Sequence, residues 1–232
     1  MNKLNLLLTN DDSYNSSYLH VVKDELKKIG NVYVFAPKEV MSAKSCSCTL
    51  TRGLSVIKEK ENEYMIDGTP SDCVNLGNYY LKKELGIHID LVVSGCNKGE
   101  NISYDTMYSG TIGACLEASK NHIPSIAFSA PINCDVIKEW ILPCMKFAFN
   151  NNIVKEENIV SFNFPLDFSK IIGIKRSFFE YRDDTHYYDL VDGKYVAKRI
   201  INEPILINSE PYLFQKSNYI SCLVLSNSLK KD

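Results

Sequence analysis

Short apolar runs alternate along the first part of the chain with segments whose apolar residues recur at helical spacing. The apolar runs have the length of buried strands and end at polar residues; they are residues 4–9, 31–37, 89–95, 125–129 and 159–164. The segments with helical spacing are residues 18–29, 73–85, 108–116 and 136–149. A strand, a helix and a second strand in this order predict a right-handed parallel crossover. The pattern therefore predicts an α/β protein.

Glycine and proline mark several boundaries between these segments. We expect Gly30 to follow the end of the first helix as its C′ residue and Gly86 to end the second. The stretch Gly68-Thr69-Pro70 is typical of turn and helix-capping chemistry. Pro143 predicts a kink or a break in the helix over residues 136–149.

The character of the sequence changes after three consecutive asparagines, Asn150-Asn151-Asn152. From residue 171 onward, strand-like pieces replace the alternation, and residues 191–194 suggest a hairpin turn. We expect residues 1–150 to form the core with the candidate site. Residues 151–232 would complete the sheet and add a β-hairpin arm for oligomerisation, because an isolated hairpin is only marginally stable.

Composition and charge narrow the functional classes. With 232 residues and a net charge of −2, the chain does not have the strongly basic surface of a protein that coats nucleic acids. No apolar run approaches membrane-spanning length and the N-terminus has no long apolar region, so we expect a cytoplasmic protein. The 8 cysteines include no Cys-x-x-Cys pair and are expected to be reduced thiols.

Two adjacent carboxylates, Asp11 and Asp12, end the first apolar run. Ligands of open α/β sheets bind beyond the carboxyl ends of the strands, and two neighbouring carboxylates there repel each other unless a cation or proton intervenes. Such hard oxygen ligands suit Mg²⁺, Mn²⁺ or Ca²⁺. The alternative is that the acidic residues cap the following helix.

Other polar side chains follow the ends of later strands, so that parallel strands would bring them to the same rim. Ser42 lies in the loop after the second strand, and Asn97 follows residues 89–95. Ser109 and Thr111 begin a helix whose N-terminus could bind an anion, although both could be simple caps. Carboxylates, an amide and a hydroxyl beside a helix N-terminus together suit a metal-assisted phosphoryl site.

The order of these motifs resembles that of the SurE (stationary-phase survival protein) family over about residues 3–130. The matching stretches are Asn10-Asp11-Asp12, Ala36-Pro37 with Ser42 and Ser45, and residues 68–74, 94–101 and 108–111. Proteins of that family are metal-dependent nucleoside 5′-monophosphate phosphatases that form dimers or tetramers. The resemblance implies a Rossmann-like, mainly parallel sheet with helices on both faces and a swapped, β-rich C-terminal arm.

The resemblance also implies roles for individual residues. The metal ligands would be Asp11, Asp12, Ser42 and Asn97, and the phosphate pocket would be lined by Asn101, Ser109, Gly110 and Thr111. The implied cofactor is one divalent cation per subunit, Mg²⁺ or Mn²⁺, with Ca²⁺ as an alternative occupant. The implied partners are a nucleoside monophosphate substrate and further copies of the chain, as a homodimer or homotetramer, with no nucleic-acid polymer and no membrane.

The sequence also departs from the family pattern. Ser13 and Ala43 stand where the family usually has glycine, so their turns must avoid or tolerate a positive φ. The late Thr-Asp segment and the terminal Thr-Pro-Leu strand ending are not recognisable around residues 210–212 and 223–225.

The expected reaction is hydrolysis of a phosphate monoester, with Asp11, Asp12 and Asn101 as catalytic residues. Asp11 would orient or deprotonate the attacking water, and Asn101 with the helix start at 109–111 would hold the phosphoryl oxygens. A covalent aspartyl-phosphate route stays open. The alternative function is a nucleotide-binding regulator without catalysis. A dinucleotide-dependent oxidoreductase is disfavoured because the first strand-to-helix turn lacks Gly-x-Gly-x-x-Gly.

Overall fold

The structure is a computed structural model that describes residues 3–182, 184–204 and 206–226. Its strands are β1 (Leu4–Thr9), β2 (Gly30–Pro37), β3 (Val56–Lys60), β4 (Glu63–Ile66), β5 (Leu91–Lys98), β6 (Ser125–Ala130), β7 (Asn158–Asn163), β8 (Gly173–Arg176), β9 (Thr185–Val191), β10 (Lys194–Ile200) and β11 (Tyr219–Ser226). Its helices are α1 (Ser17–Leu26), α2 (Pro70–Glu84), α3 (Asp105–Tyr108), α4 (Gly110–Lys120), α5 (Ile137–Asn150) and α6 (Glu210–Lys216).

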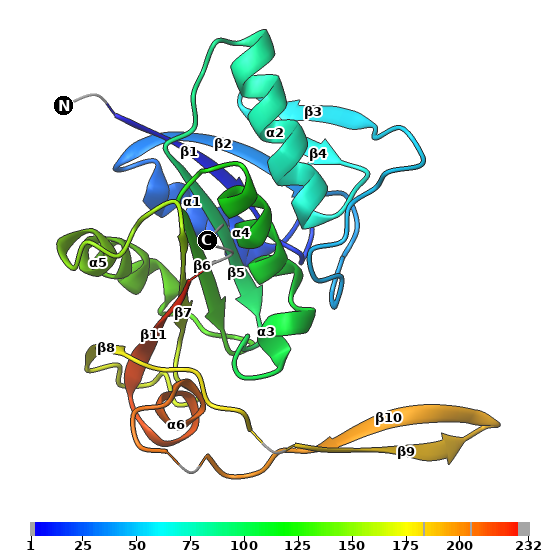
Figure 1. Cartoon of the computed structure of the whole chain (residues 1–232), viewed down its shortest axis with the longest axis vertical. Coiled ribbons are helices and arrows are strands. Elements are labelled where there is room, and N and C mark those ends of the chain that lie inside the picture. The colour runs from blue at the N-terminus through cyan, green and yellow to red at the C-terminus, as the bar shows by residue number, and fades with distance from the viewer. Residues whose placement is uncertain (1–2, 183, 205, 227–232) are drawn as a thin grey trace, which may run out of the picture.

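Within the described residues the main sheet has 9 strands in the order β3-β4-β2-β1-β5-β6-β7-β11-β8 (Figure 1). The strands from β4 to β7 are all parallel to one another. The chain leaves β1 for β2 on one side and reaches β5 on the other. The strand order therefore reverses at β1, and the carboxyl ends of β1 and β5 meet where open α/β sheets bind ligands.

Helices cover both faces of the sheet, as the family resemblance implied. On one face α1 and α5 pack against Leu6, Leu8 and Phe128 in the larger hydrophobic core. On the other face α2 and α4 cover Leu7, Phe35 and their neighbours, and Figure 1 shows these two helices side by side. The α/β class with a mainly parallel sheet is confirmed, and burial on both faces explains why the central strands are continuous apolar runs.

Most local signals have the predicted effect. Thr69 begins α2 with a capping box in which its side chain accepts a hydrogen bond from the Asp72 backbone and Asp72 reciprocates, and Gly86 follows the end of α2 with a φ of 67°. One prediction was wrong: Gly30 is the first residue of β2, where a Cβ would lie 2.5 Å from the Leu4 carbonyl oxygen. Of the kink or break predicted at Pro143, the break does not occur, because α5 continues through this residue.

The chain after residue 150 continues the same sheet. β7 pairs with β11 in antiparallel register and β11 pairs with β8 in parallel register. β9 and β10 form a separate hairpin, which extends away from the body of the protein in Figure 1. The predicted turn joins these strands, with Asp192 and Gly193 at φ values of 48° and 73°. The short helix α6 was not predicted.

Two further findings concern the surface and the thiols. No described helix has the length and apolar character needed to cross a bilayer. All 8 cysteines are free, and only Cys46 and Cys48 are not buried.

Candidate functional site

A pocket of about 330 Å³ opens at the carboxyl ends of β1 and β5. Its lining includes five of the predicted site residues, namely Asp11, Ser42, Asn97, Asn101 and Ser109. The other three, Asp12, Gly110 and Thr111, lie directly behind this lining through the contacts described below. Elements that are far apart in the sequence thus bring all eight residues to one region, because parallel strands place their following loops at the same edge.

Asp11 is almost fully buried just after β1, with 4% of its surface exposed. Its Oδ1 accepts a hydrogen bond of 2.8 Å from the Thr111 hydroxyl. Burial raises the pKa of Asp11 to about 6; the charge of Asp12 also raises it, while the Thr111 hydrogen bond lowers it. Gly110 permits the close approach of α4, since a Cβ there would lie 3.0 Å from the Asp11 Cβ.

Asp12 points to the neighbouring strand. Its Oδ2 accepts a hydrogen bond of 2.8 Å from the backbone N–H of Lys98, at the end of β5. Burial raises the pKa of Asp12, while the Lys98 hydrogen bond and charge lower it. The interpretation of the two aspartates as helix caps was wrong: the N-cap residue of α1 is Ser16, and the first turn of α1 contains no acidic residue.

The loop that carries Ser42 is tied to the same region at two points. The Met41 backbone N–H donates to the Asp11 carbonyl oxygen at 2.7 Å, and the Ser45 N–H donates to the Tyr108 carbonyl oxygen at 2.9 Å. Ser42 is exposed between these anchors. From β5, Asn97 donates a hydrogen bond of 2.9 Å through Nδ2 to the Gly99 carbonyl oxygen, so that its amide oxygen is the atom suited to bind a cation.

The N-terminus of α4 closes another side of the pocket. Ser109 is its N-cap, and its hydroxyl accepts a hydrogen bond of 3.2 Å from the Ile112 backbone. The capping interpretation of Ser109 is therefore correct, and it is compatible with a place in the pocket wall. Asn101 is buried and donates from Nδ2 to the Ser129 hydroxyl at 2.9 Å.

The two residues that replace family glycines adopt left-handed backbone conformations. Ser13 has a φ of 75° and Ala43 a φ of 57°. The Asn10 side chain donates a hydrogen bond of 2.9 Å to the Ser13 carbonyl oxygen and so supports the first turn. Both turns thus tolerate a positive φ rather than avoid it.

Sequence reasoning missed two charged residues of the pocket wall, Asp105 and Arg199. Arg199 comes from β10 and forms a bidentate ion pair with Asp105, at 2.6 and 2.9 Å. A further contact of 2.8 Å joins Arg199 to Asp184. No local pattern could have found this set, because the hairpin and α3 are about a hundred residues apart and meet only in the folded chain.

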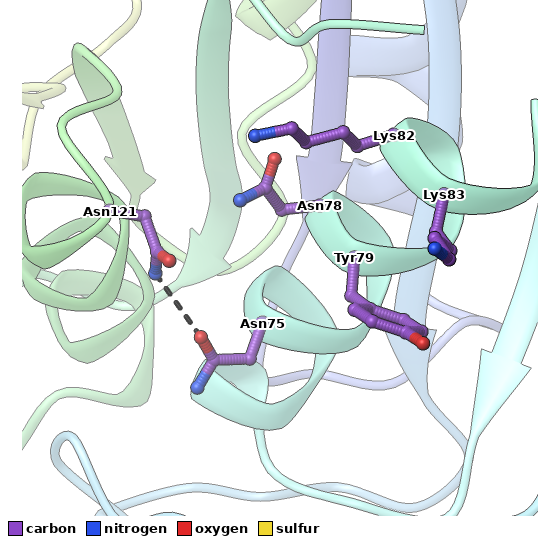
Figure 2. A pocket seen from close by; sticks show the side chains of 6 residues that line it. All are labelled: Asn75, Asn78, Tyr79, Lys82, Lys83 and Asn121. Atoms are coloured by element: carbon purple, nitrogen blue, oxygen red, sulfur yellow. Dashed lines mark hydrogen bonds between the residues drawn. The ribbon is translucent and has the colours of Figure 1, made fainter. Parts of the chain in front are cut away.

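A second pocket, of about 600 Å³, lies on the outer side of α2. Figure 2 shows its lining, which consists of Asn75, Asn78, Tyr79, Lys82 and Lys83 of α2 and of Asn121 at the end of α4, with a hydrogen bond between Asn75 and Asn121. The described lining contains no carboxylate and none of the predicted site residues, so it lacks the charged oxygen ligands that a hard cation prefers.

The chemistry of the donors around the smaller pocket suits a hard divalent cation. The donors of hydrogen bonds to the Asp11 and Asp12 side chains include the Thr111 hydroxyl and the Lys98 backbone N–H; both are neutral groups, which do not cancel the charge of a carboxylate. In the described part of the chain, no three His, Cys, Asp or Glu side chains are grouped to hold a metal. A cation would therefore depend on two carboxylates together with the neutral oxygens of Ser42 and Asn97.

The fold and this pocket define an α/β protein with a candidate binding site at the point where the strand order reverses. The family model described as "Survival protein SurE" matches residues 6–183. The chain is 34% identical over 220 residues to the 5′-nucleotidase SurE of Clostridium tetani, covering 90% of this chain and 86% of that protein. It is 36% identical over 183 residues to the 5′-nucleotidase SurE of Actinobacillus succinogenes, covering 74% and 70%.

A solved structure gives the same result. The crystal structure of the SurE protein from Aquifex aeolicus superposes with a TM-score of 0.83 at 30% identity, covering 98% of this chain and 95% of that one. The chain belongs to the SurE family.

Proposed function

We propose that this protein is a divalent-metal-dependent phosphatase that hydrolyses nucleoside 5′-monophosphates to nucleoside and phosphate. The observation that carries the proposal is the convergence of Asp11, Asn97 and Ser42 with the N-terminus of α4 on one pocket. The relatives named 5′-nucleotidase SurE support the choice of substrate.

We assign Asp11, Asp12, Ser42 and Asn97 as the ligands of the cation, which would be Mg²⁺ or Mn²⁺, with Ca²⁺ as an alternative occupant. When bound, such a cation polarises a phosphoryl oxygen and lowers the pKa of an attacking water. The paired carboxylates supply the negative charge that this cation requires, and the buried position of Asp11 limits access of bulk water to that charge.

The phosphate side of the pocket is assigned to Asn101, Ser109, Gly110 and Thr111. The positive end of the α4 dipole and the Asn101 amide would stabilise phosphoryl oxygens as charge develops on them. Asp11 is the group placed to orient or accept a proton from the water. Because its pKa is raised by burial, it is a better base than an exposed aspartate.

The test is a phosphate-release screen over nucleoside monophosphates with Mg²⁺, Mn²⁺, Ca²⁺ or chelator. We expect cation-dependent release that Asp11→Asn and Asp12→Asn each reduce by at least about a hundredfold. Normal activity in either variant would contradict the assignment of ligands. If nucleotides stabilise the protein thermally but no phosphate is released, the protein is instead a nucleotide-binding regulator.

We also propose that the β9–β10 hairpin serves a homodimer or homotetramer. The hairpin carries exposed Tyr188, Leu190 and Tyr195, with 65%, 65% and 76% of their surfaces accessible. A two-stranded ribbon with such side chains is marginal alone and gains stability when another copy covers it. The free thiols suit a reducing compartment, and we place the protein in the cytoplasm.

A further inference from the structure

Asn101 is held from behind by a chain of buried polar side chains. Its amide already donates one hydrogen bond to Ser129, which leaves the second N–H of Nδ2 for a ligand in the pocket. Its backbone is held by Asn163, the last residue of β7, and Asn163 in turn contacts Glu210, the first residue of α6. Neither Asn163 nor Glu210 is a lining residue of the pocket.

Asn163 clasps the Asn101 backbone through two hydrogen bonds of opposite direction. The Asn101 N–H donates to Asn163 Oδ1 at 2.8 Å, and Asn163 Nδ2 donates to the Asn101 carbonyl oxygen at 3.3 Å. Both contacts require one orientation of the Asn163 amide. In the flipped orientation the Asn163 NH₂ group would face the Asn101 N–H, and the Asn163 amide oxygen would face the Asn101 carbonyl oxygen.

Glu210 selects this orientation. Its Oε1 accepts a hydrogen bond of 2.9 Å from Asn163 Nδ2, and a flipped amide would turn its oxygen toward that acceptor. Glu210 is itself fixed: it is fully buried, and its backbone N–H donates to the Phe178 carbonyl oxygen at 3.0 Å. Burial raises the pKa of Glu210 to about 8, although hydrogen bonds from the Ser103 backbone and Asn163 lower it. Glu210 is therefore mostly protonated at neutral pH, and uncharged glutamine is the closest substitute for it.

We propose that Asn163 and Glu210 are positioning residues that fix Asn101 for binding of a phosphoryl group, with α6 acting through β7 on the phosphate side of the pocket. This inference rests on the proposed function. Among the described side-chain hydrogen bonds, none joins Asp11, Asp12, Ser42 or Asn97 to Asn101, Asn163 or Glu210. The two residues should therefore affect phosphate binding without affecting cation binding.

The test compares Glu210→Leu with Glu210→Gln. The leucine variant removes the acceptor, whereas the glutamine variant keeps a neutral acceptor for Asn163. With Glu210→Leu we expect inorganic phosphate to bind about tenfold more weakly at saturating Mg²⁺, and kcat/KM for a nucleoside monophosphate to fall by at least about tenfold. Mg²⁺ affinity should change by less than about twofold, and Glu210→Gln should stay within about threefold of the wild type.

Glu180→Gln is the matched control. Glu180 is also buried and also holds the start of α6, through the Ser209 hydroxyl and the Leu206 backbone, whereas Glu210 holds the Asn163 amide. We expect it to lower thermal stability and to leave phosphate binding within about threefold of the wild type. Equal weakening by Glu180→Gln and Glu210→Leu would overturn the proposal, because a general loosening of α6 would then explain both.

Asn163→Ala removes the clasp from its other end and must reproduce the weaker phosphate binding if Glu210→Leu does not fold. Failure of both variants to fold would assign the pair to the fold alone and overturn the proposal, as would unchanged phosphate binding or a parallel loss of Mg²⁺ affinity. The phosphate titrations are independent of turnover. If the wild type binds phosphate but hydrolyses no nucleotide, the proposed function fails while the positioning role is still decided.

Discussion

Replacing Asp11 with asparagine should stabilise the metal-free protein while it impairs the site. The side chain is buried, and its carboxylate accepts a hydrogen bond from the neutral hydroxyl of Thr111. Asparagine has nearly the same shape, keeps an oxygen for Thr111 and carries no charge. Opposite effects on stability and on activity are the signature of a group placed for function.

The magnitude follows from the pKa of Asp11. Burial raises this pKa from 3.8 to about 6. Each unit by which the pKa of Asp11 differs between the folded and unfolded states corresponds to about 1.4 kcal/mol of stability. The ionised carboxylate therefore costs the metal-free fold about 3 kcal/mol above pH 6. Below pH 3.8 the group is protonated in both states and the cost disappears. Wild-type stability from this group therefore falls as the pH rises from about 4 to 6.

Urea unfolding in the presence of chelator, at pH 8 and at pH 4, measures this difference. We expect Asp11→Asn to exceed the wild type by up to about 3 kcal/mol at pH 8 and by less than about 1 kcal/mol at pH 4. Added Mg²⁺ should then stabilise the wild type and have little effect on the variant. Destabilisation by the substitution at both pH values would refute the reasoning, since it would show that the carboxylate stabilises the fold.

Three further predictions concern neighbouring features. Mn²⁺ affinity should fall about tenfold for each pH unit below 6, because the cation must displace a proton from Asp11; calorimetric titrations at pH 5 and 7 that agree would contradict this. Gly113→Ala would place a Cβ 2.0 Å from the Ser45 carbonyl oxygen, so it should cost about 1–3 kcal/mol of stability and displace the loop that carries Ser42. The displacement is measured as a loss of phosphate release. The control is Gly53→Ala, where a Cβ meets nothing within 4 Å. Deleting the tip of the β9–β10 hairpin should reduce the mass seen by analytical ultracentrifugation to that of the monomer, and an unchanged mass would exclude the hairpin as the interface.

The centre of the sheet was predictable because its strands are buried on both faces and are therefore continuous apolar runs. The helix α6 and the position of Gly30 were not predicted because neither is determined by a long apolar pattern. α6 spans only seven residues, Glu210–Lys216, which is too short for a helical period to stand out, although Ser209 and Pro211 are ordinary helix-start residues. Gly30 was assigned to a helix end from local chemistry, whereas the close approach of β1 requires a glycine there.

The position of the candidate site was predictable from the topology of the sheet. The residues that hold the site from the C-terminal part of the chain were not predictable. Asp11 and Ser42 follow strands and Asn97 is the second-last residue of β5, so the parallel order of the sheet alone brings them to one edge. Arg199 and Glu210 lie on the hairpin and on α6. Their contacts with Asp105 and Asn163 join segments separated by 94 and 47 residues, and no sequence period relates such segments.

Two departures from local conformational preference lie in the turns next to Asp11. Ser13 adopts a φ of 75° two residues after it, and Ala43 adopts a φ of 57° two residues after Met41, whose backbone N–H binds the Asp11 carbonyl oxygen. A side chain in the left-handed region costs roughly 1–2 kcal/mol, and the buried carboxylate adds a cost of its own. β1, which leads into the first of these turns, is buried from Leu6 to Thr9 and can sustain that loss. A pocket that binds a cation would recover part of it, since the ligand relieves the carboxylate repulsion that the metal-free fold must bear.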